Sequence, residues 1–134
     1  MGPHSWVTLV TIAAILVYAW MGVRVGKARR VSGIAAPAMT GDPILERHIR
    51  VQANTLEWLP IFLPALWLFA IYWNDLIAAG LGVVWIIGRV LYATGYVADP
   101  GKRELGFLVQ ALAAAILLFG AAGRAIWTLV VIGA

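Results

Sequence analysis

Residues 43–75 read PILERHIRVQANTLEWLPIFLPALWLFAIYWND, and this stretch has the pattern of a long helix that crosses a membrane. Asp42 is suited to cap that helix and Pro43 to begin it. At 1.5 Å per residue, a helix over residues 43–73 is about 46 Å long, whereas the hydrocarbon core of a bilayer is about 30 Å thick. We therefore expect its polar first turns to protrude at one surface and its apolar remainder to span the bilayer.

Three further stretches have the length and composition of spanning helices, namely residues 5–23, 75–97 and 104–132. The chain of 134 residues is 63% hydrophobic and 12% charged, whereas a water-soluble domain is nearer half apolar and a quarter charged. This length is enough for one domain. We predict an all-α integral membrane protein, a four-helix bundle that forms a single domain over residues 1–134.

The composition also excludes several kinds of site. The chain has no cysteine, so a thiol that reacts here must come from a substrate, and thiolate metal sites are excluded. His4 and His48 fall at opposite ends of the expected bundle, which argues against a haem held by both. We expect no metal. The net charge of +4 is explained by basic residues beside apolar segments, so we expect no nucleic-acid partner.

The basic residues mark one side of the membrane. The expected loops at residues 24–41 and around 99–103 carry most of the lysines and arginines outside the helices, whereas the connection at 74–75 is a tight turn. By the positive-inside rule, the basic side is cytoplasmic and both termini face out. We expect a multi-pass protein of a bacterial inner membrane.

Polar and ionisable residues inside the apolar segments are candidates for function, because charge is costly within a membrane. Residues spaced three and four apart lie on one face of a helix. Two such sets occur, one on the helix from residue 43 and one on the next helix: Arg50, Asn54 and Glu57, then Arg89, Tyr92 and Tyr96.

The two sets should face each other across a hairpin that turns at Asn74. Glu57 and Arg89 are nearly equally far from this turn, so we expect them to form an ion pair, the deepest in a polar ladder. One interpretation is purely structural, a strut between two helices. The other is a site for a small anionic ligand with an amino group, because the ladder also opens toward Arg29, Arg30 and Arg103.

Three motifs carry a resemblance to a known family. They are ERHIRVQANTLEWLPIF at 46–62, RVLYATGY at 89–96, and Arg29-Arg30 followed by TGDP at 40–43. Together they resemble the MAPEG family, the membrane-associated proteins of eicosanoid and glutathione metabolism, over about residues 20 to 104.

The resemblance implies a homotrimer in which glutathione binds between subunits, bent into a U, with its sulfur near the lipid. It implies a glutathione S-transferase of detoxification that conjugates lipophilic electrophiles, with reduction of lipid hydroperoxides as a side activity. Arg103 matches the arginine that stabilises the thiolate, and Arg30 a second arginine near the reacting centre. Trp58 matches a glutathione-binding position where the family pattern has tyrosine, so a hydroxyl contact is lost. The other matching glutathione-binding positions are Arg50, Asn54, Glu57, Arg89, Tyr92 and Tyr96, with Arg29 and Gln52 from the neighbouring subunit.

Two rival functions remain at this point. The first is a non-catalytic, lipid-binding member of the same family, which would not need the full set of glutathione-binding residues. The second is a small multidrug transporter, which would use an isolated glutamate that titrates. An ion pair between Glu57 and Arg89 argues against that role. The sequence leaves open which electrophile reacts and whether the thiol is glutathione.

Overall fold

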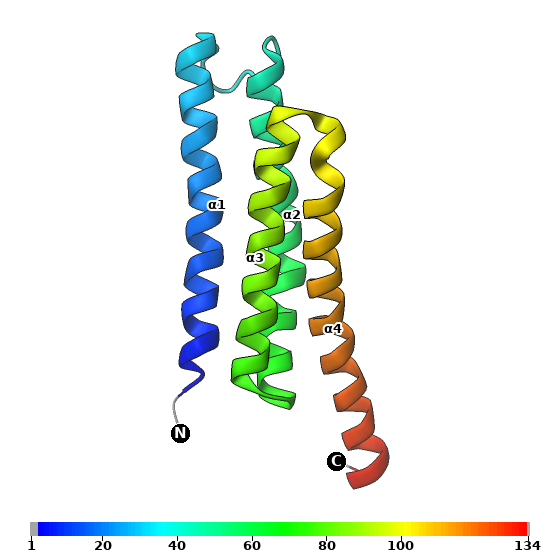
Figure 1. Cartoon of the computed structure of the whole chain (residues 1–134). Coiled ribbons are helices and arrows are strands. Elements are labelled where there is room, and N and C mark those ends of the chain that lie inside the picture. Colours follow the sequence, from blue (N-terminus) through cyan, green and yellow to red (C-terminus); the bar gives the residue numbers. More distant parts are fainter. Residues whose placement is uncertain (1–2, 134) are drawn as a thin grey trace.

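The computed structural model describes residues 3–133 as a bundle of long helices. Figure 1 shows the helices running alternately up and down, with both chain ends at one end of the bundle. The α1–α2 connection and the short 3-10 helix η1 lie at the other end, called the basic end below. Each of the four long helices is long and apolar enough to cross a membrane, as predicted. The elements are α1 (Ser5–Ser32), α2 (Pro43–Tyr72), α3 (Asp75–Ala98), η1 (Pro100–Arg103) and α4 (Glu104–Ile132).

Helix α1 is longer than the expected 5–23, and the predicted loop over 24–41 is wrong in its first part. The helix continues to Ser32 and ends at Gly33, whose left-handed backbone (φ 75°) lets its N–H donate to the carbonyl of Arg29. Hydropathy locates the end of the apolar segment, whereas alanine, lysine and arginine continue a helix into water. The basic residues of this region therefore lie on a helix surface and not in a flexible loop.

Side-chain caps set the beginnings of α2 and α3. The Asp42 carboxylate accepts a hydrogen bond of 2.9 Å from the Leu45 N–H, and the Asn74 side chain accepts one of 3.0 Å from the Ile77 N–H. Such caps satisfy backbone donors that the first helical turn leaves free. Helix α2 runs unbroken past Pro60 and Pro64. The result is the antiparallel α2–α3 hairpin that the sequence predicts.

Glycines bring α3 and α4 into close contact. A Cβ atom added at Gly88 would lie 2.6 Å from the backbone nitrogen of Gln110, and one added at Gly106 would overlap the backbone of Tyr92. Small residues allow this approach between membrane helices. The contact fixes the beginning of α4, and with it η1, against the part of α3 that carries Tyr92 and Tyr96.

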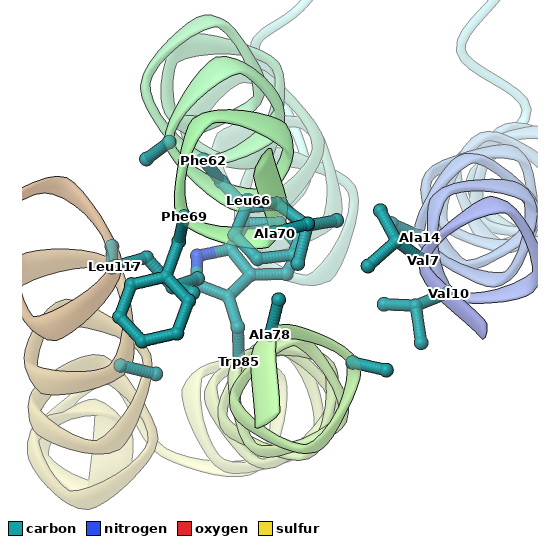
Figure 2. Close-up of a cluster of buried hydrophobic side chains, with 14 of the residues drawn as sticks. Val7, Val10, Ala14, Phe62, Leu66, Phe69, Ala70, Ala78, Trp85 and Leu117 are labelled. Carbon is teal, nitrogen blue, oxygen red and sulfur yellow. The ribbon is translucent and has the colours of Figure 1, made fainter. Parts of the chain in front are cut away.

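Most residues of the apolar core belong to the half of the bundle nearer the chain ends. Figure 2 shows how their side chains pack. The centre of the core is Phe62 stacked on Trp85, with ring centroids 3.9 Å apart and planes 3° apart. Leu117 of α4 packs from one side, while Val7 and Val10 of α1 approach from the other. The polar residues of α2 and α3 are thereby left in the half nearer the basic end.

Candidate functional site

A cavity of about 370 Å³ opens near the basic end, where α2, α3 and η1 meet. A second cavity of about 280 Å³ shares Asn54, Tyr92 and Arg103 with it and adds Glu104 and Phe107 of α4. The structure therefore brings together six of the residues selected from the sequence. The first cavity is lined by Arg50, Ala53, Asn54, Glu57, Tyr92, Tyr96 and Arg103.

The expected ion pair between Glu57 and Arg89 is not formed within the chain. Arg89 is fully buried, and its Nη2 donates a 2.6 Å hydrogen bond to Oγ1 of Thr55, whereas Glu57 is exposed. Residues 55 and 57 are about 200° apart around a helix of 3.6 residues per turn. The prediction that Glu57 lies on the face of α2 that meets Arg89 is therefore wrong. Without this ion pair, Glu57 is no longer excluded as the isolated glutamate of a transporter.

Arg89 approaches the cavity from behind Tyr92 and does not line it. Its guanidinium lies 4.5 Å from the centre of the Tyr92 ring and 6.0 Å from that of Trp85. Its Nε and Nη1 atoms are buried and have no acceptor among residues 3–133. Arg89 therefore has two N–H donors beside the polar cavity that could still form charge-assisted hydrogen bonds.

Arg103 and the two tyrosines form the wall opposite α2. The ring centroids of Tyr92 and Tyr96 are 5.7 Å apart, and the Arg103 guanidinium lies 5.8 Å from that of Tyr96. The Asp99 side chain accepts from the Gly101 N–H at 3.0 Å, which shapes the turn that presents Arg103. On the other wall, Oδ1 of Asn54 is buried without a donor in the described chain. The cavity thus offers cations, phenols, a carboxylate and an open amide acceptor.

Trp58 lies beside the polar cavity and does not line it. Its ring meets that of Phe107 edge to face, with centroids 5.7 Å apart and planes at 82°. It also lines an apolar cavity of about 180 Å³ between α2 and α4, together with Ile61 and Phe119. Trp58 therefore lies between a polar cavity and an apolar one.

Arg29, Arg30 and Gln52 do not join this group. The Arg29 Nη1 donates 2.7 Å and 3.4 Å hydrogen bonds to the carbonyls of Ala38 and Ile34. Arg30 lines a separate cavity between α1 and α2. Gln52 points at α1, where its Nε2 atom lies 3.1 Å from the position of a Cβ added at Gly22. One chain therefore holds two separate groups of the selected residues, on different sides of α2.

Two residues of the site were missed in the sequence. Thr55 belongs to the buried stripe of α2 that includes Val51, Leu59 and Phe62, and a hydroxyl in an apolar stripe is a detectable signal. Phe107 resembles any apolar residue in the first turns of α4, so nothing in the sequence distinguishes it. Among residues 3–133, no three histidine, aspartate or glutamate side chains gather as a metal site would require.

Comparison with known proteins confirms the family that the motifs resemble. The MAPEG family model matches residues 7–123, which include every residue of both polar cavities. The chain belongs to the MAPEG family. With its four apolar helices, it is therefore an integral membrane protein.

Several MAPEG relatives resemble the chain over most of its length. Microsomal glutathione S-transferase 2 of Homo sapiens is 40% identical over 125 residues, which are 92% of this chain and 85% of that protein. Leukotriene C4 synthase of Cavia porcellus is 34% identical over 109 residues, 81% of this chain and 73% of that protein. An uncharacterised protein of Synechocystis sp. is 48% identical over 124 residues, 92% of this chain and 90% of that protein.

Proposed function

We propose that this MAPEG protein is a membrane glutathione S-transferase that activates the glutathione thiol and joins it to lipophilic electrophiles. The main support for this proposal is the cavity that is lined by Arg50, Asn54, Glu57, Tyr96 and Arg103. Glutathione has two carboxylates, one ammonium group and one thiol. Arg50 suits the carboxylates, Arg103 suits the thiolate, and the exposed carboxylate of Glu57 suits the ammonium group.

The reaction we propose begins with loss of the thiol proton to water. A free cysteine thiol has a pKa near 8.5, and the thiolate is the nucleophile. A guanidinium beside the sulfur stabilises the anion and lowers the thiol pKa, and arginine keeps its own proton throughout. Arg103 is the residue assigned to this role, because it lines both polar cavities.

The thiolate sulfur then forms a bond to an electrophilic carbon. With an epoxide, the carbon–oxygen bond breaks and the alkoxide takes a proton from water; with an activated arene, the leaving group departs as an anion. The apolar cavity beside Trp58 supports entry of the electrophile from the bilayer. A lipid hydroperoxide is the second substrate class we consider, with two thiols oxidised to a disulfide and the peroxide reduced to an alcohol and water.

The site we propose is shared between subunits of a homotrimer. Its support is the separation of the selected residues: Arg29 and Gln52 lie on the α1 side of α2, away from Arg103. A ring of subunits places the α1 side of one chain against the Arg103 cavity of the next, because a closed ring repeats one heterologous contact. Arg30 would then approach the neighbour's reacting centre. The basic end would face the cytoplasm of a bacterial cell, and both termini would face out.

Conjugation assays in detergent test this function. The assay measures thioether formation from glutathione and an activated chloroarene, with wild type beside Arg103→Ala and Lys102→Ala. Lys102 is a matched control because it is an exposed cation next to Arg103 that lines neither cavity. We expect turnover in wild type and Lys102→Ala and a loss of at least tenfold in Arg103→Ala. Wild type without turnover would favour the lipid-binding alternative, and an unchanged Arg103→Ala would remove the assigned role.

A further inference from the structure

A larger cavity, of about 570 Å³, lies between α1 and the first turns of α2. It shares no lining residue with the two cavities at Arg103. Arg24, Lys27 and Arg30 of α1 line it at intervals of three residues, which places them on one side of the helix. The transferase mechanism does not account for Arg24 or Lys27.

The charge of this cavity is positive and largely unopposed. Asp42 is the acidic residue among its lining residues, and its Oδ2 is already the acceptor that caps α2 at Leu45. His48 of α2 adds a further nitrogen-bearing side chain to the wall. The three cations of α1 therefore outnumber the one carboxylate of this cavity, which favours an anion as its ligand.

Arg24 has an open hydrogen-bonding position. Its guanidinium lies 4.7 Å from the centre of the Trp20 ring, and this cation–π contact holds the half-buried side chain in place. Its Nη1 atom is buried and has no acceptor among residues 3–133. Buried donors are nearly always paired, so an unpaired one beside a cavity indicates a missing acceptor.

The remaining walls of the cavity are apolar, which indicates what carries the anion. Val23, Val31 and Ile44 line it together with the Trp20 ring. The cavity also lies where the apolar run of α1 gives way to basic residues, the level of a membrane interface. Basic pockets between membrane helices on the cytoplasmic side are typical sites for anionic lipid headgroups.

We propose that this cavity binds one anionic phospholipid per chain. The headgroup phosphate accepts hydrogen bonds from Arg24 and Lys27, and the acyl chains follow the apolar side of α1 past Trp20 and Val23. Basic residues that only set topology need neither a cavity nor a buried unpaired donor. The test of this proposal is separate from the transferase activity, because neither Arg24 nor Lys27 belongs to the site of Arg103. Arg30 also lines the cavity but is left unchanged, since it is assigned to the neighbour's reacting centre.

Native mass spectrometry of the full chain in detergent tests the proposal. The protein is titrated with phosphatidylglycerol, with phosphatidylcholine, and with phosphatidylglycerol in an excess of inorganic phosphate. The variants are Arg24→Gln and Lys27→Gln, with Lys102→Gln as a control that removes one exposed cation at the same end of the bundle. Lys27 is exposed, so its substitution tests the site without a risk to folding.

We expect wild type to retain one phosphatidylglycerol per chain and to bind phosphatidylcholine more weakly. Loss of a charge-assisted hydrogen bond should weaken phosphatidylglycerol binding by about tenfold in Arg24→Gln and in Lys27→Gln, with Lys102→Gln unchanged. Equal binding of both lipids, or an equal loss in Lys102→Gln, would overturn the specific site. Full displacement of the lipid by inorganic phosphate would overturn the phospholipid as the ligand.

Discussion

Nη2 of Arg89 on α3 donates a 2.6 Å hydrogen bond to Oγ1 of Thr55 on α2, and Thr55 in turn donates to the carbonyl of Val51 at 2.9 Å. The first bond joins α3 to α2 behind the cavity, and the second holds the Thr55 hydroxyl against its own helix. Arg89 has no other hydrogen-bond partner in the described chain, and its Tyr92 contact is through the ring face. The geometry of the Tyr92 wall therefore depends on Thr55.

Replacing Thr55 by valine should destabilise the fold. The substitution keeps the shape but removes the acceptor, so the buried guanidinium loses its hydrogen bond at a cost of about 2–3 kcal/mol. Thr55→Ser keeps the hydroxyl and should stay near wild type. The midpoint of thermal unfolding in detergent measures the stability of both variants against wild type. Equal midpoints for Thr55→Val and Thr55→Ser would show that this hydrogen bond carries no stability.

Glu57→Gln should leave stability almost unchanged and weaken glutathione binding. Because Glu57 is exposed and unpaired in the described chain, its charge supports no buried ion pair. The loss of a charge-assisted contact to the ligand ammonium should raise the KM for glutathione about tenfold. Breaking a buried ion pair would instead cost about 3–5 kcal/mol. A large fall in the thermal midpoint would therefore contradict an unpaired Glu57 and support an ion pair between Glu57 and Arg89.

Gly106→Ala should separate α3 from α4. The added methyl group overlaps the backbone of Tyr92, and overpacking of this kind typically costs about 1–3 kcal/mol. Gly123→Ala is the matched control on the same helix, because a Cβ there meets nothing within 4 Å. The thermal midpoint should fall for the first variant and hold or rise slightly for the second. The opposite order would contradict the close helix contact.

Mixing two impaired variants should restore activity if the site is shared between subunits. Arg103→Ala removes one half of the proposed site, and Arg29→Ala/Gln52→Ala removes the other. In a randomly mixed ring, about a quarter of the contacts join two intact halves. Co-expression should then give about that fraction of wild-type turnover. No restoration, with both proteins folded and associated, would contradict a site built between chains.

The sequence predicts the membrane-spanning helices well because hydropathy over about 20 residues is a strong signal. It fails at the end of α1, where Lys27 and Arg30 are polar yet helical. The sequence also predicts the wrong partner for Arg89. Distance from the hairpin turn gives the depth of a residue, but the facing side of α2 is set by packing, which selects Thr55 over Glu57. The cavity at Arg24 is formed by α1 and α2 together, so no local sequence pattern predicts it.

The residues at Arg103 were nevertheless found together from their spacing and their family motifs. Arg50, Asn54 and Glu57 share a helix face, and Tyr92 and Tyr96 share another, as periodicity alone requires. Arg103 joins them through the turn at η1, which periodicity does not describe. At that turn, the family resemblance added most to the residue pattern, because it assigned Arg103 to the site.

The activation of glutathione by Arg103 is open to direct spectroscopy. The detergent-solubilised protein is mixed with glutathione, and the ultraviolet absorbance of the thiolate is followed as pH rises, for wild type, Arg103→Ala and Lys102→Ala. A cation that stabilises the thiolate lowers the thiol pKa, so thiolate should be present at neutral pH in wild type and in Lys102→Ala. In Arg103→Ala it should form only as pH approaches the ordinary thiol pKa near 8.5. Identical titrations for wild type and Arg103→Ala, with glutathione bound to both, would contradict the mechanism.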